Sequence, residues 1–137
     1  MSLFKLFDVS GTAMSAQTLR LNVVASNLAN ADSVASSPEA AYRARNPIFA
    51  SVMEGQLKHG EAVGVKVLGV VENPDNGNMV YSPGHPLANE QGYIFTSNVN
   101  VAEEMANMIS ASRSYQTNVE VMNTSRQLLS STLKLGE

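Results

Sequence analysis

Both ends of this chain carry a long row of residues spaced alternately three and four apart, which is the pattern of helices that pack on other helices. The first row consists of Phe4, Phe7, Gly11, Met14, Thr18, Leu21, Ala25 and Leu28. The second consists of Val101, Met105, Met108, Ser112, Tyr115, Val119, Met122, Arg126, Leu129 and Leu133. The sequence therefore predicts two long helices, one at each end.

Signals for helix ends support both assignments. Asn100 is followed three residues later by Glu103, which is the pattern of a capping box at a helix start. The first helix is expected to end near Asn30, because Asp32 and Ser33 follow it. No proline or glycine interrupts the second helix before Gly136.

The middle of the chain has a different character. The stretch "SVASSPEAAYRARNP" is predicted to be a loop, because its two prolines discourage a continuous helix. "AVGVKVLGVVE" alternates like a strand, the turn-rich "NPDNGN" follows it, and "MVYS" is then expected as a short returning strand. "GYIFTS" is predicted to be a third strand. The expected fold is α+β, with an N-terminal helix (1–33), a small β-rich middle domain (34–99) and a C-terminal helix (100–137).

The two helices need a surface on which to bury their apolar rows. A middle region of about 60 residues has only a marginal core of its own, so we expect the helices to pack together as a coiled-coil-like hairpin. A self-contained antiparallel helical pair without further neighbours remains the alternative. The residues predicted to make the helix–helix contact are Phe7, Gly11, Met14, Leu21, Leu28, Met108, Tyr115, Met122 and Leu129.

Composition and motifs argue against several classes of function. The net charge of −3 is not that of a nucleic-acid-binding protein. There are no cysteines, and the two histidines, His59 and His85, have no metal-ligand spacing. The glycines form no phosphate-binding motif. We therefore predict no catalytic site, metal, cofactor or small-molecule substrate.

The N-terminus "MSLFKLFDVS" lacks the apolar run of a cleaved signal peptide. No stretch approaches the roughly 18 apolar residues of a membrane-spanning helix. If the chain leaves the cytoplasm, we expect it to do so without a cleaved signal.

Asparagines crowd the first helix at Asn22, Asn27 and Asn30, although asparagine is a mediocre helix former. Amides beside an apolar row suit a helix surrounded by other helices, because they can donate and accept hydrogen bonds without the desolvation cost of a charge. The pattern therefore favours a chain that works inside an assembly.

The segment "SGTAMSAQTLRLNVVASNLANADS" resembles the N-terminal helix motif of the bacterial flagellar axial proteins, which are the rod, hook and hook-associated subunits. Its Ser10-Gly11 pair and its Ala-x-Asn-Leu-Ala-Asn ending at 25–30 carry the resemblance. "YRARNPIF", "YSPGHPLANEQGY" and the whole segment from 98 to 136 are similar to the proximal rod subunits of that family. Two positions depart from the family pattern: Thr12, where a large apolar residue is common, and Ser97, where proline is common. We expect Met14 to make the apolar contact that a large residue at position 12 would otherwise make.

The resemblance implies that the terminal helices assemble into a tubular wall around an export channel, with the middle domain facing outward. It also implies a mechanical role, the transmission of torque along the rod of the basal body in the periplasm. The implied partners are other copies of the chain, the rod-base protein FliE, the rod proteins FlgB and FlgF, and the flagellar type III export apparatus.

Seven polar or small residues are then expected to meet neighbouring subunits: Ser10, Asn22, Asn27, Asn30, Arg113, Gln116 and Asn118. Two other readings stay open on the residues alone. A soluble coiled-coil adaptor or secretion chaperone would dimerise through the same rows. A small hydrolase would need Asp, His and Ser side chains to converge on folding.

Overall fold

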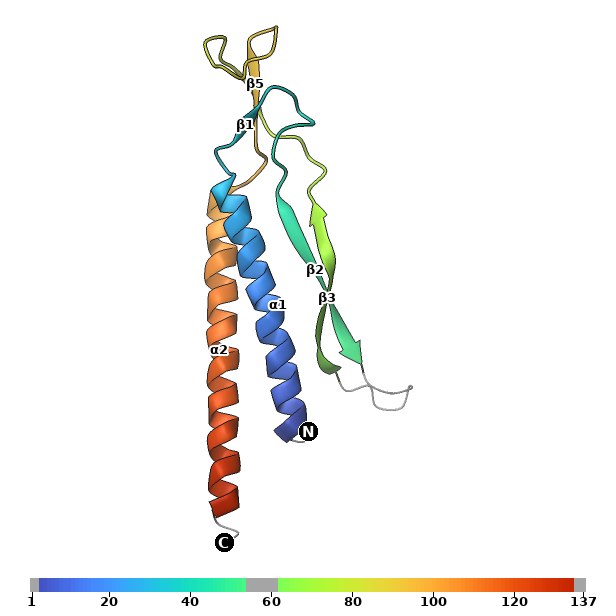
Figure 1. The fold of residues 1–137 in the computed structure, drawn as a ribbon, viewed down its shortest axis with the longest axis vertical. Helices are drawn as coiled ribbons and strands as arrows, with labels where there is room; N and C mark the ends of the chain where they lie inside the picture. Colours follow the sequence, from blue (N-terminus) through green and yellow to red (C-terminus); the bar gives the residue numbers. More distant parts are fainter. Residues whose placement is uncertain (1–2, 54–61, 135–137) are drawn as a thin grey trace.

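Two long terminal helices flank a small β-containing region (Figure 1). The computed structural model describes residues 3–53 and 62–134. The elements in chain order are α1 (Leu3–Ala29), β1 (Val34–Ala35), β2 (Arg45–Met53), β3 (Ala62–Glu72), β4 (Met79–Tyr81), β5 (Tyr93–Thr96) and α2 (Val101–Lys134). The α+β fold predicted from the sequence is confirmed.

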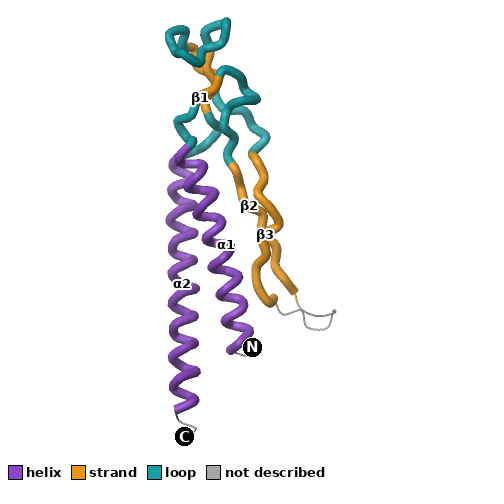
Figure 2. The backbone as a smooth tube through the Cα atoms, viewed as in Figure 1, coloured by secondary structure: helices purple, strands orange, loops and turns teal. Residues whose placement is uncertain are grey.

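The helices run antiparallel and lie side by side, so the predicted hairpin is present (Figures 1 and 2). Helix α1 has 27 residues and α2 has 34, which correspond to lengths of about 40 and 50 Å. The C-terminal end of α2 consequently extends past the N-terminal end of α1 (Figure 1).

Side chains form hydrogen bonds with the backbone at one end of each helix, at positions that the sequence predicts. At the start of α2, Asn100 Oδ1 accepts hydrogen bonds from the backbone N–H groups of Ala102 at 3.1 Å and Glu103 at 3.3 Å. Such a cap satisfies two of the free donors of the first helical turn. At the end of α1, Asn30 Nδ2 donates at 2.8 Å to the carbonyl of Ser26, which also accepts the backbone N–H of Asn30 at 3.2 Å.

Strands β2 and β3 form an antiparallel two-stranded ribbon that lies along α1, on the side away from α2 (Figure 2). Their pairing runs from Arg45 opposite Glu72 to Met53 opposite Ala62, with irregularities between Ile48 and Phe49 and at the far end. Strands β1, β5 and β4 form a separate three-stranded sheet, in that order, beyond the end of the helix pair (Figure 1). Helix α1 therefore lies between α2 and the ribbon.

The strand pairing differs from the sequence prediction in two ways. Strand β4 does not return along β3 but pairs with β5, and β3 pairs with β2, a segment whose start the sequence analysis took for a loop. In the described residues the ribbon has two strands, so no strand pairs with the outer edge of β2, and Pro47, which has no N–H group, fits there. The turn-rich segment crosses to β5 instead, where Thr96 N donates to Asn78 O at 3.0 Å.

The interior of the described chain is small. Its buried apolar residues are mostly alanines, and the largest side chain with essentially no exposure is the amide of Asn27. Many larger apolar side chains stay exposed, so the chain by itself leaves much apolar surface for other molecules to cover.

Candidate assembly interface

Small side chains line the seam between the helices. On α2, Glu104, Ala111 and Ser125 are buried, and their spacing is a multiple of seven residues. On α1, Ser10 and Val24 are buried, again separated by a multiple of seven. Heptad spacing places each set on one helix face. Side chains as small as alanine and serine allow the two backbones to approach closely.

Polar contacts fix how the helices lie against each other. Arg20 Nη2 of α1 donates to Asn107 Oδ1 of α2 at 2.9 Å. Asn27 Nδ2 donates to Glu104 Oε2 at 3.1 Å, and both residues are buried. Since hydrogen bonds are directional, these two links set the register of the pair.

None of the residues predicted to make the helix–helix contact is fully buried. Tyr115 is 37% exposed. The other eight are half-buried: Phe7, Gly11, Met14, Leu21, Leu28, Met108, Met122 and Leu129. The three buried positions of α2 each stand one residue before a member of the predicted row. They are Glu104, Ala111 and Ser125, which precede Met105, Ser112 and Arg126. The packing role of the predicted residues stays a prediction.

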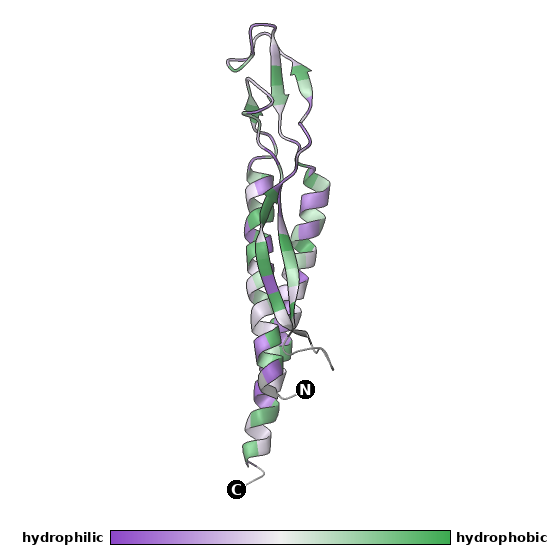
Figure 3. Cartoon of the chain, turned by 90° about the vertical axis from the view of Figure 1, so that its right-hand side faces the viewer, coloured by the Kyte–Doolittle hydropathy of each residue, from purple (hydrophilic) through white to green (hydrophobic). Residues whose placement is uncertain are grey.

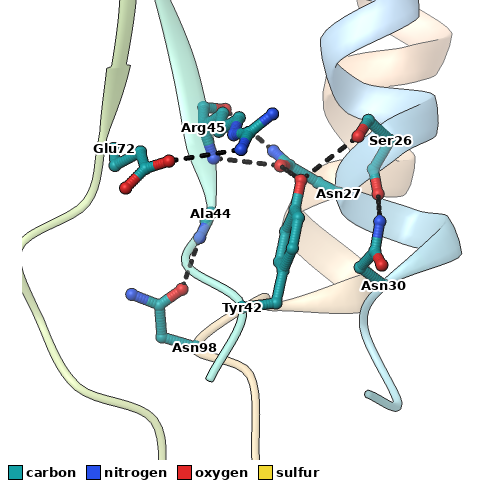
Figure 4. Close-up of polar contacts among 8 residues, drawn as sticks. All are labelled: Ser26, Asn27, Asn30, Tyr42, Ala44, Arg45, Glu72 and Asn98. Atoms are coloured by element: carbon teal, nitrogen blue, oxygen red, sulfur yellow. Dashed lines mark hydrogen bonds and ion pairs between the residues drawn. The ribbon is translucent and has the colours of Figure 1, made fainter. Parts of the chain in front are cut away.

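A polar junction centred on the buried Asn27 joins α1 to the start of β2 (Figure 4) and to Glu104 of α2. We use this name for Ser26, Asn27, Tyr42, Arg45 and Glu104. The Asn27 side chain makes four hydrogen bonds: its Nδ2 donates to Arg45 O at 2.8 Å and to Glu104, and its Oδ1 accepts from Arg45 N at 2.9 Å and from Tyr42 Oη at 3.0 Å. The Tyr42 hydroxyl also lies 3.2 Å from Ser26 Oγ. The full hydrogen-bonding capacity of the amide is used, which offsets the cost of its burial.

Weaker contacts surround the junction. The Arg45 guanidinium lies 5.7 Å from the centre of the Tyr42 ring and forms an exposed ion pair with Glu72 at 3.3 Å. An ion pair at such an exposed site contributes little to stability. The backbone N–H of Ala44 donates to Asn98 Oδ1 at 2.6 Å, so the segment before α2 is also attached to the residue that precedes β2 (Figure 4).

The structure divides the residues that were expected to meet neighbouring subunits. Ser10 and Asn27 are 3% and 0% exposed, so their side chains lie within the chain. The amides of Asn30 and Asn118 are half-buried and donate to their own helices, at Ser26 O and Ser114 O. The exposed members, which a neighbour could reach directly, are Asn22, Arg113 and Gln116.

Sequence reasoning did not identify Tyr42, Arg45 or Glu104 as partners of Asn27. Tyr42 and Arg45 fall in the segment that was read as a loop, and Glu104 was read only as a helix-start charge. No local signal in the sequence marks these contacts, because they join Asn27 to residues 15, 18 and 77 positions away.

Large apolar side chains are exposed along α2 and the ribbon. Figure 3 colours the hydrophobic residues of both elements green. On α2 they are Val101, Met105, Ile109, Tyr115, Val121, Leu128 and Leu133, with Leu133 73% exposed. On the ribbon they are Ile48, Phe49, Val52, Leu68, Val70 and Val71. Exposed apolar surface of this extent is typical of a protein that binds partners.

The side chains that the sequence offered for metal binding or catalysis are not grouped in the described residues. Within residues 3–53 and 62–134, no three His, Cys, Asp or Glu side chains are grouped so that they could hold a metal ion. His85 Nδ1 accepts a hydrogen bond from Leu87 N at 3.1 Å in a turn, while His59 lies outside the described residues. In the same ranges, neither helix is long and apolar enough to cross a membrane.

Comparison with known proteins places these features in a family. Residues 7–35 match the family model described as "Flagella basal body rod protein", and residues 90–135 match "Flagellar basal body rod FlgEFG protein C-terminal". The two matched segments contain most of α1 and all of α2.

Curated relatives match along the entire chain. The flagellar basal-body rod protein FlgC of Yersinia enterocolitica is 49% identical over 138 residues, covering 100% of both chains. The FlgC proteins of Escherichia coli O6:H1 and Salmonella typhimurium are 48% and 47% identical, again over 100% of both chains. The resemblance read from the sequence is thereby confirmed, and the chain belongs to the FlgC family of flagellar basal-body rod proteins.

Proposed function

We propose that this chain is a structural subunit of the flagellar basal-body rod, which it joins through its terminal helices. Its relatives are named as rod proteins of the flagellar basal body. The observation that carries the mode of assembly is the exposed apolar surface of α2, because a helix that leaves such side chains in water gains free energy when neighbours cover them.

The exposed apolar side chains of α2 lie on both sides of the line along which α2 packs on α1. This arrangement suits a helix that has neighbours on two sides. Met105 and Ile109 are four residues apart and share one flank. Val121 and Leu128 are seven residues apart and lie on the other flank. Subunits packed side by side through these flanks would form the proposed tubular wall around an export channel.

Torque transmission requires that each subunit move as one body. The polar junction supports this role, because Asn27 attaches both helices to the start of the ribbon. The middle region, which includes the sheet beyond the helix ends, would then face outward and follow the helices without slipping.

Membership of a rod family supports assembly with other rod components in the basal body. The specific partners that we propose are other copies of this chain, FliE, FlgB and FlgF, with delivery by the type III export apparatus without a cleaved signal peptide. The exposed Asn22, Arg113 and Gln116 are proposed as polar contacts with these neighbours.

The test places a charge on each flank of α2 in a strain that lacks its own copy of the gene. Ile109→Asp and Leu128→Asp change side chains that are 55% and 57% exposed, so the isolated chain should keep its circular dichroism spectrum and its stability within about 0.5 kcal/mol. Both variants should abolish swimming in soft agar and be missing from purified basal bodies.

The matched control is Leu87→Asp, which changes a side chain that is 46% exposed in the sheet region beyond the helices. It should leave swimming and incorporation unchanged. Normal swimming by both α2 variants would contradict assembly through the helices.

A further inference from the structure

The segment between β3 and β4 contains a dipeptide that is chemically labile. Asn76 is the one asparagine of the chain that glycine follows. Because glycine has no Cβ atom, its backbone nitrogen can approach the asparagine amide that precedes it. Asn76 is exposed, and neither Asn76 nor Gly77 lies in a helix, a strand or a hydrogen-bonded turn. The amide is therefore open to attack by the neighbouring nitrogen, and the site is open to water.

The backbone nitrogen of Gly77 is available as the nucleophile for this attack. Among the described residues it donates no hydrogen bond. Replacement of the glycine is blocked, because a Cβ atom at this position would overlap the carbonyl oxygen of Thr96. The fold therefore requires glycine after Asn76, and the labile dipeptide is retained.

Arg43 contacts the group that would react. Its Nη2 donates a hydrogen bond to Asn76 Oδ1 at 3.0 Å. When Gly77 N attacks Asn76 Cγ, this oxygen takes up negative charge. A positively charged donor that is already in contact with the oxygen stabilises that charge and accelerates the reaction.

The surroundings also favour an acidic product at position 76. Arg43 Nε is buried and has no hydrogen-bond partner among the described residues. The N–H groups of a guanidinium form a fork that can donate two parallel hydrogen bonds to one carboxylate. The amide of Asn76 offers the fork one acceptor, because its nitrogen is itself a donor, whereas a carboxylate offers two acceptors. A carboxylate at this position would therefore provide a partner for a buried donor that lacks one.

We propose that Asn76 is a site of spontaneous modification, which loses ammonia and becomes an acidic residue held by Arg43. Gly77 N gives up its proton and forms a bond to Asn76 Cγ, the Cγ–Nδ2 bond breaks, and the amide nitrogen leaves with that proton as ammonia. Water then opens the resulting succinimide ring. Attack of water at Cγ gives aspartate, and attack at the backbone carbonyl carbon of Asn76 gives isoaspartate. This inference does not depend on the proposed function.

Hydrogen bonds on both sides of the dipeptide favour one of the two products. Asn98 Nδ2 donates to Asp75 O at 2.6 Å. Asn78 N donates to Thr96 Oγ1 at 3.2 Å. Isoaspartate adds a carbon atom to the backbone between these two attachments, whereas aspartate keeps the backbone unchanged. We therefore expect aspartate to be the main product in the folded chain.

The test follows the amide in the purified, folded chain. The chain is incubated in neutral buffer, and samples taken over time are digested and analysed by mass spectrometry that separates asparagine, aspartate and isoaspartate. Asn76 should be converted at least about tenfold faster than the exposed Asn123, which is followed by the β-branched Thr124. The ratio of aspartate to isoaspartate should be higher in the folded chain than in urea. Equal rates at the two asparagines, or conversion in urea but not in the folded chain, would overturn the inference.

The contribution of Arg43 is tested with Arg43→Met, which should slow the conversion of Asn76 at least about threefold. The matched control is Arg126→Met, which changes an exposed arginine of α2 and should leave the rate unchanged. Equal rates in the two variants would show that Arg43 has no part in the reaction.

A second measurement, urea unfolding, tests the product independently of the rate. Asn76→Asp should raise the urea midpoint of the unsubstituted chain, and it should not raise the midpoint of the Arg43→Met variant. A lower midpoint for Asn76→Asp, or the same gain with and without Arg43, would overturn the assignment of Arg43 as the partner of the product.

Discussion

The side chain of Asn27 forms with Arg45 the pair of hydrogen bonds that a neighbouring strand would form. Asn27 Nδ2 donates to Arg45 O at 2.8 Å, and Arg45 N donates to Asn27 Oδ1 at 2.9 Å. The helical side chain thus satisfies both backbone groups of the first residue of β2. Since the same amide also donates to Glu104, one side chain connects three elements.

The first prediction concerns Asn27→Asp, which keeps the size of the side chain and removes its donors. A carboxylate oxygen would then face the Arg45 carbonyl and the Glu104 carboxylate, with no proton between them. We expect a loss of about 3 kcal/mol or more in the free energy of unfolding, because a buried charge would face two acceptors. Urea unfolding of the purified chain measures this.

The control for that change is Asn22→Asp, which introduces the same charge at an exposed position of the same helix. It should alter stability by less than about 0.5 kcal/mol. Equal effects of the two substitutions would show that the junction does not hold the fold together.

A second prediction concerns the Tyr42 hydroxyl. Tyr42→Phe removes the donor to Asn27 Oδ1 and the partner of Ser26 Oγ, and it leaves the ring in place. The expected loss is about 1–2 kcal/mol. Tyr81→Phe, at a tyrosine that is 65% exposed, is the matched change and should be nearly neutral in the same thermal unfolding experiment.

A third prediction tests the turn between β3 and β4, which directs β4 to pair with β5 rather than with β3. A Cβ atom added at Gly77 would overlap the carbonyl oxygen of Thr96, which is a backbone atom that cannot move aside alone. Gly77→Ala should therefore cost about 2–4 kcal/mol in urea unfolding. Gly84→Ala adds a Cβ with nothing within 4 Å and should cost little. A neutral Gly77→Ala would mean that the turn is placed differently.

A fourth prediction concerns the attachment of the ribbon to α1. A Cβ atom at Gly64 would lie 2.5 Å from Thr12 Oγ1, the same oxygen that accepts a hydrogen bond from Val65 N. In Gly64→Ala, the Val65 amide should exchange its hydrogen faster, because its acceptor is displaced. In Gly69→Ala, where nothing lies within 4 Å of the new atom, exchange should stay unchanged. Unchanged exchange in both variants would argue against this contact.

The helices were predictable because their signals are local and repeated. Apolar spacing over many turns and the Asn100 cap identify α1 and α2 without knowledge of any distant contact. The strands β3 and β5 were also predictable from β-branched and aromatic residues.

The strand partners were not predictable, because pairing depends on contacts far apart in the sequence. Pro47 obscured β2, and a dense turn signal at 73–78 favoured a hairpin that the chain does not form. The close approach of Gly77 to the backbone of Thr96 is a tertiary contact, and no nearby residue in the sequence indicates it.

The sequence indicated that the helices make polar contacts, but it did not show which residues make them. Amides on α1 indicated polar contacts, yet sequence alone could not tell that Asn27 faces inward while Asn22, five residues earlier, faces solvent. The alternating three- and four-residue spacing favoured Met105 and Ser112, whereas the structure buries the neighbouring Glu104 and Ala111.

The four hydrogen bonds of Asn27 also determine how the chain responds to a twisting load. Apolar surfaces in contact resist separation but allow sliding, since dispersion contacts depend little on direction. Hydrogen bonds weaken steeply when donor and acceptor lose their alignment. A junction built from an amide therefore resists shear between the helices and the ribbon, and its stiffness comes from geometry rather than from the amount of surface it buries.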